Sequence, residues 1–161
     1  MAELREQVQR KFGDAVLTTH AEHGDQTVII RKDAVLEVMR WMRDEPSMLF
    51  NFMMDLTAVD YKGIKPPVWR FEVVYHLYSL KHNHRIRVKV PVADDSPSID
   101  SIVSIWKGAD WFEREVWDMY GIAFKGHPNL KRILLYEEFE GHPLRKDYPI
   151  KKRQPLIGPD N

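Results

Sequence analysis

The sequence predicts an α+β fold: a mostly antiparallel sheet with helices packed on one face, followed by a long extended C-terminal tail. Three observations lead to this prediction. Apolar and polar residues alternate over two neighbouring segments, 68–78 and 84–90, which is typical of half-buried strands. Segments with apolar residues three or four positions apart predict helices on either side of them. From residue 122 onward, repeated prolines and glycines leave little regular structure.

The N-terminal part is expected to contain two helices and a pair of strands. The helices are marked by apolar residues at helical spacing, such as Leu4, Val8 and Phe12, and the strands by short β-branched runs. The predicted elements are a helix over 3–12 ended by Gly13, strands over 15–19 and 26–31 joined by a turn, and a helix over 34–43 with Asp33 as its N-cap.

The apolar stretch that follows has helix and strand character together. We expect a short helix over 47–53 and then a strand over 56–61. The next segment, 62–67, contains two consecutive prolines, which exclude a helix and predict a loop.

The segment 68–78 is the clearest strand. One set of alternating side chains is large and apolar and is expected on the core side: Trp69, Phe71, Val73, Tyr75 and Leu77. The segment 84–90 follows after a short turn and is expected to pair with it as a hairpin, ahead of a polar loop over 91–97.

Two further helices are expected before the tail. The first covers 99–106, from the spacing of its apolar residues. The second covers 111–120. Asp110 and Glu113 form a D-x-x-E capping pattern at its start, and Gly121 ends it.

The composition excludes several classes of function. Lys plus Arg and Asp plus Glu are 24 each, so the formal net charge is zero, which argues against non-specific nucleic-acid binding. The chain has no cysteine, which removes disulfides, thiolate nucleophiles and cysteine-ligated iron–sulfur clusters. No apolar run approaches the ~20 residues that span a bilayer, so we expect no direct membrane insertion.

The tail is too apolar for a solvated linker and too rich in proline to form its own core. Two interpretations remain open: it wraps its own domain, or it lies on a partner protein. We therefore divide the chain into one α+β domain, 1–121, and an extended partner-docking tail, 122–161.

Candidate catalytic groups are few. Glu115 and Asp118 lie three residues apart on the predicted helix 111–120, which suits a carboxylate pair, and Arg114 is placed to form an ion pair with Asp118. The tripeptide Gly-His-Pro occurs at 126–128 and 141–143, which is also typical of two tight turns. No complete nucleotide-binding or metal-ligand motif is present, so we predict no catalytic, cofactor-binding or metal-binding residues.

Several segments resemble a known family. Residues 113–128 are EREVWDMYGIAFKGHP and residues 141–149 are GHPLRKDYP, with LKRIL at 130–134 between them. These segments, with weaker support from 70–77 and 85–88, resemble the C subunit of respiratory complex I, the proton-pumping NADH:quinone oxidoreductase. Lys131 stands where that family often has arginine, a change that keeps the charge.

The resemblance implies a structural subunit without a redox centre in the peripheral, hydrophilic arm of the complex. The whole complex would contain FMN, iron–sulfur clusters and quinone, none bound by this chain, and would couple electron transfer from NADH to quinone to proton translocation. The implied partners are chiefly the D subunit, which we call the quinone-site subunit, and the neighbouring iron–sulfur subunits. The implied location is the cytoplasmic side of the inner (plasma) membrane, where the complex holds the chain peripherally.

The resemblance also suggests which residues form the partner interface. Charged groups of the predicted helix and tail are expected in buried or interfacial contacts, and aromatic residues as apolar anchors. The expected interface residues are Glu113, Arg114, Glu115, Trp117, Asp118, Tyr120, Phe124, His127, Pro128, Arg132, Arg145 and Asp147.

Two alternatives stay open. One is the equivalent subunit of a ferredoxin-linked or membrane-hydrogenase-type complex, because the sequence does not identify the electron donor. The other is a stand-alone enzyme that uses Glu115, Asp118 and His127 for acid–base chemistry.

Overall fold

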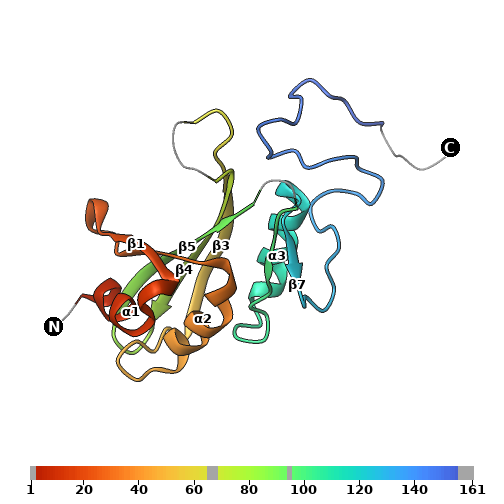
Figure 1. Ribbon diagram of the computed structural model, residues 1–161. Helices are drawn as coiled ribbons and strands as arrows, with labels where there is room; N and C mark the ends of the chain where they lie inside the picture. The colour runs from red at the N-terminus through yellow and green to blue at the C-terminus, as the bar shows by residue number, and fades with distance from the viewer. Residues whose placement is uncertain (1–2, 65–68, 94–95, 156–161) are drawn as a thin grey trace.

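A computed structural model describes residues 3–64, 69–93 and 96–155 (Figure 1). Its main element is a five-stranded sheet with strand order β1-β2-β5-β4-β3. Every neighbouring pair is antiparallel except β2 and β5, which are parallel. The strands are β1 (Val16–His20), β2 (Thr27–Ile30), β3 (Phe52–Asp60), β4 (Phe71–Ser79) and β5 (His84–Val92). The predicted α+β class with a mostly antiparallel sheet is confirmed.

Over the described residues, three helices complete the domain: α1 (Leu4–Phe12), α2 (Val35–Asp44) and α3 (Ala109–Tyr120). Short 3₁₀ turns cover Gly13–Ala15, Glu22–Gly24 and Lys32–Ala34. Figure 1 shows α1 and α2 in front of the sheet and α3 beside β3. Each helix adds buried apolar side chains to one core cluster that it shares with the sheet, among them Val8, Val38 and Val116.

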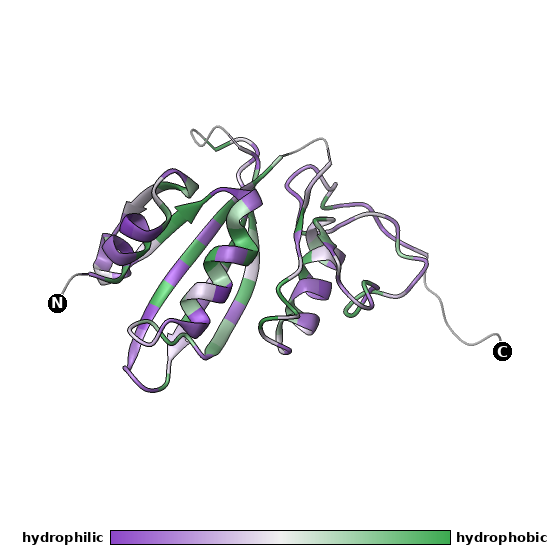
Figure 2. Ribbon diagram, turned by 60° about the horizontal axis from the view of Figure 1, so that its bottom comes forward, coloured by the Kyte–Doolittle hydropathy of each residue, from purple (hydrophilic) through white to green (hydrophobic). Residues whose placement is uncertain are grey.

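The core lies on one side of the sheet because the strand residues alternate. Phe71, Val73, Tyr75 and Leu77 of β4 are completely buried, as the pattern predicted, while Trp69 precedes the strand. Figure 2 shows the same alternation of hydrophobic and hydrophilic residues along the strands. The burial of each such large side chain contributes roughly 1.5–3 kcal/mol.

The predicted helix over 47–53 is wrong. Residues 46–48 form a turn, and β3 begins at Phe52, where it pairs with Tyr78 of β4. Antiparallel pairing along all of β4 extends β3 four residues further toward the N-terminus than predicted. Met48 in the turn and Phe50 between the turn and β3 are buried, so their apolar character reflects packing rather than helix.

The helix predicted over 99–106 is also wrong. Ser98–Asp100 forms a short strand, β6, which pairs in parallel with β7 (Ala123–Lys125). A single turn follows, in which the amide of Trp106 donates to the carbonyl of Ile102. The apolar spacing was correct for burial, because Ile99 and Ile102 are buried, but the long-range pairing with β7 determined the backbone.

The predicted N-caps were wrong at both α2 and α3. Asp33 lies inside a 3₁₀ turn and pairs with Arg31, and Ala34 occupies the N-cap position without a side-chain bond. Helix α3 starts at Ala109, so Asp110 already lies in its first turn.

Smaller differences concern element ends. β5 continues to Val92, two residues into the predicted loop 91–97. Residues 62–64 form the start of the predicted loop 62–67, while residues 65–68, including the predicted first residue of β4, lie outside the described residues. Helix α3 ends as predicted, with Gly121 in the left-handed conformation at φ 76°.

Candidate functional site: the anchored tail on helix α3

The tail attaches to α3 at one buried carboxylate. Asp118 exposes none of its surface because it lies on the side of α3 that the tail covers. Its Oδ2 accepts hydrogen bonds from three successive backbone amides, those of Ile133 (3.0 Å), Leu134 (2.9 Å) and Leu135 (3.0 Å). Successive amides that point at one oxygen form an anion-binding concavity, here filled by the chain's own side chain.

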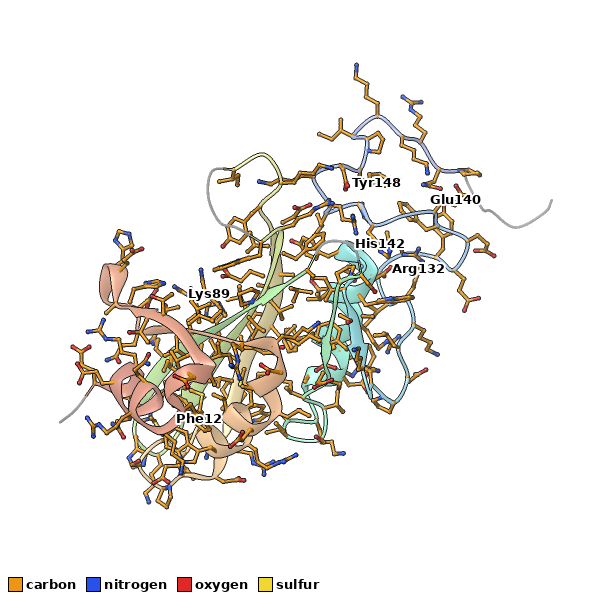
Figure 3. The ribbon with its side chains drawn as sticks, in the orientation of Figure 1. Phe12, Lys89, Arg132, Glu140, His142 and Tyr148 are labelled. Carbon is orange, nitrogen blue, oxygen red and sulfur yellow. The ribbon has the colours of Figure 1, made fainter. Side chains whose placement is uncertain are left out.

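Arg132 completes this anchor. Its guanidinium donates to Oδ1 of Asp118 at 2.6 Å and to the carbonyls of Phe139 at 2.6 Å and Gly141 at 3.3 Å. It also lies over the rings of Trp117 and Phe139, at 5.9 and 5.7 Å. One side chain thus joins the helix, the amide turn and the next tail segment, as Figure 3 shows for the labelled Arg132 beside α3.

The electrostatics of Asp118 favour its charged form. Burial alone would raise the pKa of its carboxyl, but the bonds from the amides of Leu135, Ile133 and Leu134 and from Arg132 outweigh it and hold the pKa below its usual range. The carboxylate is therefore ionised at neutral pH and accepts hydrogen bonds with both oxygens.

The tail also closes the C-terminal end of α3. His142 bonds through Nδ1 to the carbonyl of Asp118 at 2.9 Å, and the amide of Leu144 donates to that of Met119 at 3.1 Å. These carbonyls have no partner within the helix, so the tail provides its cap. The ring of His142 lies so close to Gly121 that a Cβ there would be 2.6 Å from it.

Two further predicted residues hold the segment that leads to this anchor. Arg114 donates to the carbonyls of Lys131 (3.2 Å) and Arg132 (3.0 Å). It does not form the predicted ion pair with Asp118, which is bonded to Arg132 instead. His127 bonds through Nε2 to the carbonyl of Asp110 at 3.1 Å and accepts the amide of Asn129 at Nδ1, so it carries its proton on Nε2.

A second, ionic anchor ties the tail to the end of the sheet. Asp147 contacts Arg70 at 2.8 Å, Arg145 at 3.2 Å and Lys62 at 3.2 Å. Arg70 also pairs with buried Asp60 at 3.2 Å. Although burial acts in the opposite direction, the bonds from Arg70 hold the pKa of both aspartates below the usual range.

Glu113 has a different role from its neighbours. It is fully buried, and its Oε1 accepts the amide of Ile102 at 2.7 Å, which fixes the turn after β6. Among the described residues its Oε2 has no partner. Burial raises the pKa of Glu113 from its usual 4.5 to about 7. It fastens the turn after β6 to α3, and the predicted D-x-x-E cap does not form.

The remaining predicted interface residues divide by exposure. Glu115 and Pro128 are exposed, Trp117 and Tyr120 are half-buried, and Phe124 is only 3% exposed and lies in the core of its own chain.

Sequence reasoning did not place the most exposed apolar side chains of α3 and the tail among the expected interface residues. These are Trp111 (64% exposed), Leu134 (61%), Leu144 (52%) and Ile150 (98%). It also missed the amides of 133–135 as a binding element, because no sequence pattern marks a row of backbone donors. Arg70, by contrast, lies in segment 70–77, which contributes to the family resemblance.

The proposed acid–base residues are not brought together as a catalytic group. Asp118 is enclosed by four donors, His127 is bonded to backbone on both ring nitrogens, and Glu115 is exposed. Within the described ranges, no three His, Cys, Asp or Glu side chains cluster to hold a metal ion. In the same ranges, no helix combines the length and apolar character needed to cross a membrane.

The fold and the site together define a class of protein: an α+β domain whose buried charges organise its own tail on a helix, with apolar side chains left exposed around them. Comparisons with known proteins identify the family to which the chain belongs. Residues 28–154 match the family model described as "Respiratory-chain NADH dehydrogenase, 30 Kd subunit". This chain belongs to that family, the C subunits of NADH-quinone oxidoreductase.

Individual relatives support the same assignment. The NADH-quinone oxidoreductase C subunit of Citrifermentans bemidjiense is 47% identical over 153 residues, which cover 94% of this chain and 92% of the relative. The corresponding C subunit of Roseiflexus sp. strain RS-1 is 46% identical over 149 residues, with 92% and 84% covered.

Two solved structures have similar folds. A trypsin-resistant fragment (1-134) of Nqo5 is 31% identical, with a TM-score of 0.67, and the match covers 78% of this chain and 95% of the fragment. A chain of the membrane-bound sulfane sulfur reductase, an archaeal respiratory membrane complex, is 22% identical with a TM-score of 0.75, covering 91% and 84%. The second match shows the fold alone.

Proposed function

We propose that this chain is a non-catalytic, cofactor-free structural subunit of the peripheral arm of NADH-quinone oxidoreductase. In this role it supports the quinone-site subunit while electrons pass from NADH to quinone and protons are translocated. Membership of the family supports the assignment of this chain to that complex. The absence of cysteine supports the lack of a cluster, because iron–sulfur clusters are held by thiolates. FMN, the clusters and quinone would belong to other subunits.

One observation carries the structural role. Buried Asp118 and half-buried Arg114 hold the tail's backbone in place, whereas Trp111, Leu134, Leu144 and Ile150 remain largely exposed. A tail fixed in this way presents apolar side chains in a set arrangement and loses little conformational entropy on binding. Exposed apolar groups of this kind mark interaction surfaces.

The proposed partners are the quinone-site subunit and the neighbouring iron–sulfur subunits. Charged residues first expected to contact the partner directly, such as Arg114, Arg132 and Asp147, would act by shaping the tail. Half-buried Trp117 and Tyr120 and exposed Trp111 would contact the partner through their free surface. The complex would hold the chain peripherally on the cytoplasmic side of the membrane.

The alternative is the equivalent subunit of a ferredoxin-linked or membrane-hydrogenase-type complex. The fold shared with a chain of the sulfane sulfur reductase complex allows it, but the names of the more similar relatives favour NADH-quinone oxidoreductase.

The test is Arg114→Ala in the complete complex. The variant loses the two bonds that hold the carbonyls of Lys131 and Arg132, so the tail is displaced while the α+β domain stays folded. We expect reduced recovery of the chain with the quinone-site subunit and reduced NADH:quinone activity. Arg40→Ala, an exposed arginine on α2, is the matched control. Normal complex yield and activity in Arg114→Ala would contradict the proposal.

A further inference from the structure

The end of the described tail forms a second kind of surface. A groove of about 290 Å³ lies between the turn at 141–142 and the segment 145–152. Its lining combines apolar or aromatic groups with two cations, Arg145 and Lys152, and one carboxylate, Asp147; the full lining is Gly141, His142, Arg145, Asp147, Tyr148, Pro149 and Lys152. We call this groove, together with exposed Lys146, Ile150, Lys151 and Arg153, the basic groove.

Its charge differs sharply from that of the whole chain. Residues 141–153 contain five cationic side chains and one acidic one, hence a net charge of +4, within a chain whose net charge is zero. The single acid, Asp147, is already engaged by Arg70, Arg145 and Lys62 of the same chain. The surplus positive charge therefore faces outward. Figure 3 shows long side chains with nitrogen ends projecting from this end of the tail, near the labelled Tyr148.

Three of these cations have no acidic partner among the described residues. Within the described part of the chain, no ion pair involves the side chain of Lys146, Lys151 or Arg153, whereas Lys152 reaches Glu140 at 3.6 Å. Ile150 lies between them and is 98% exposed. A fully exposed apolar side chain is costly to leave in water, and burial against a partner recovers its apolar area. The cations beside it can select and orient a partner that carries acidic groups.

The shape and composition favour a protein over a membrane. A bilayer surface recruits amphipathic helices with a broad apolar face, or basic clusters next to a membrane anchor. This segment is irregular, carries one protruding aliphatic residue and surrounds a concave groove that a flat headgroup surface does not enter. A groove with an aromatic wall and a cationic rim instead suits an extended peptide with carboxylates and an apolar side chain.

We propose that the basic groove binds an acidic, extended segment of a partner protein, with Ile150 seated in an apolar pocket of that partner. This inference rests on the proposed function, because it specifies the chemistry by which the tail recognises its neighbour. The cations at the rim steer and orient the acidic segment, so binding should weaken as ionic strength rises.

The test reverses the charge of the unpaired cations in the intact chain: Lys146→Glu, Lys151→Glu and Arg153→Glu together. The matched control is Lys32→Glu, Lys81→Glu and Lys107→Glu, which changes the net charge equally at exposed positions outside the tail. Binding to the purified quinone-site subunit is followed by surface plasmon resonance at low and high salt. We expect the tail variant to associate about tenfold more slowly at low salt and the control to bind like the unaltered chain.

Two results would overturn the inference. One is equal binding of the tail variant and the control to the quinone-site subunit. The other is loss of binding to vesicles of phosphatidylglycerol and phosphatidylcholine in the tail variant while its binding to that protein is unchanged, which would assign the groove to the membrane. Failure of the unaltered chain to bind the quinone-site subunit would refute the proposed function itself, and the inference with it.

Discussion

Replacing Asp118 by Asn should detach the tail from α3. The substitution keeps the size of the side chain but removes its charge. It also places an NH₂ group where an acceptor is needed, facing either Arg132 or the amides of 133–135. The guanidinium of Arg132 would then lie under the tail without a counter-charge.

The magnitude follows from the four bonds. Hydrogen bonds to a charged group contribute ~1.5–3 kcal/mol, against ~1 kcal/mol between neutral groups, so four weakened bonds lose about 2–8 kcal/mol in total, and about 3 kcal/mol is a conservative value. Removing one partner of a buried ion pair costs a similar ~3–5 kcal/mol. The tail can lift off before the sheet unfolds, so we expect the loss to appear as local opening rather than as global unfolding.

Hydrogen exchange of single amides measures this opening. A loss of about 3 kcal/mol corresponds to a roughly 150-fold faster exchange of the amides of Ile133, Leu134 and Leu135. Glu115→Gln, which removes an exposed carboxylate from the same helix, should leave these amides unchanged. If Asp118→Asn changes their exchange by less than about twofold, the carboxylate does not hold the tail and the reasoning fails.

Three other perturbations test separate parts of the structure. Glu113 keeps its proton in the folded chain up to about pH 7 but loses it near 4.5 when unfolded, so stability falls as pH rises through this window. The free energy of unfolding should fall by about 3 kcal/mol between about pH 5 and about pH 7.5, as measured by urea titrations, and Glu113→Gln should abolish this fall. If the variant shows the same fall, another group causes it. Gly121→Ala should lower the urea midpoint more than Gly126→Ala, because both glycines have positive φ but only Gly121 has a ring in the space of the Cβ; equal effects would mean that the tail does not pack there. High salt should weaken the partly exposed ionic anchor at Asp147 more than the bonds at buried Asp118, as seen in faster tryptic cleavage after Lys146; salt-independent cleavage would contradict a salt-sensitive contact there.

Much of the fold could be predicted because its signals are local. The alternation in β4 and β5 identified the core face, since a side-chain period of two is a property of each strand by itself. The spacing of Leu4, Val8 and Phe12 identified α1 for the same reason. Gly121 marked the end of α3 because a left-handed residue is needed there.

The errors lie where distant segments decide the backbone. Residues 98–100 became a strand because residues 123–125, more than twenty positions later, pair with them. The turn over 46–48 depends on β3 pairing with the whole of β4. In both places the apolar spacing predicts burial correctly, but it does not predict which distant segment provides the backbone hydrogen bonds.

The position of the candidate site could be predicted from the sequence, but the contacts that its residues make could not. The quoted segments contain Arg114, Asp118 and Arg132, so the right part of the chain was singled out. The spacing of Arg114 and Asp118 suggested a helical ion pair, whereas Asp118 bonds to a tail residue fourteen positions away and to backbone amides. Amides carry no sequence signature, because every residue except proline has one.

Limited trypsin digestion of the intact chain, alone and with the quinone-site subunit, tests the central claim most directly. The claim is that the tail, fixed on α3, is the surface that the partner covers. The exposed sites after Lys146, Lys151, Lys152 and Arg153 should be cut in the chain alone and protected when the quinone-site subunit is present. Cleavage at the same sites and the same rates with and without that partner would show that the tail is not the docking surface.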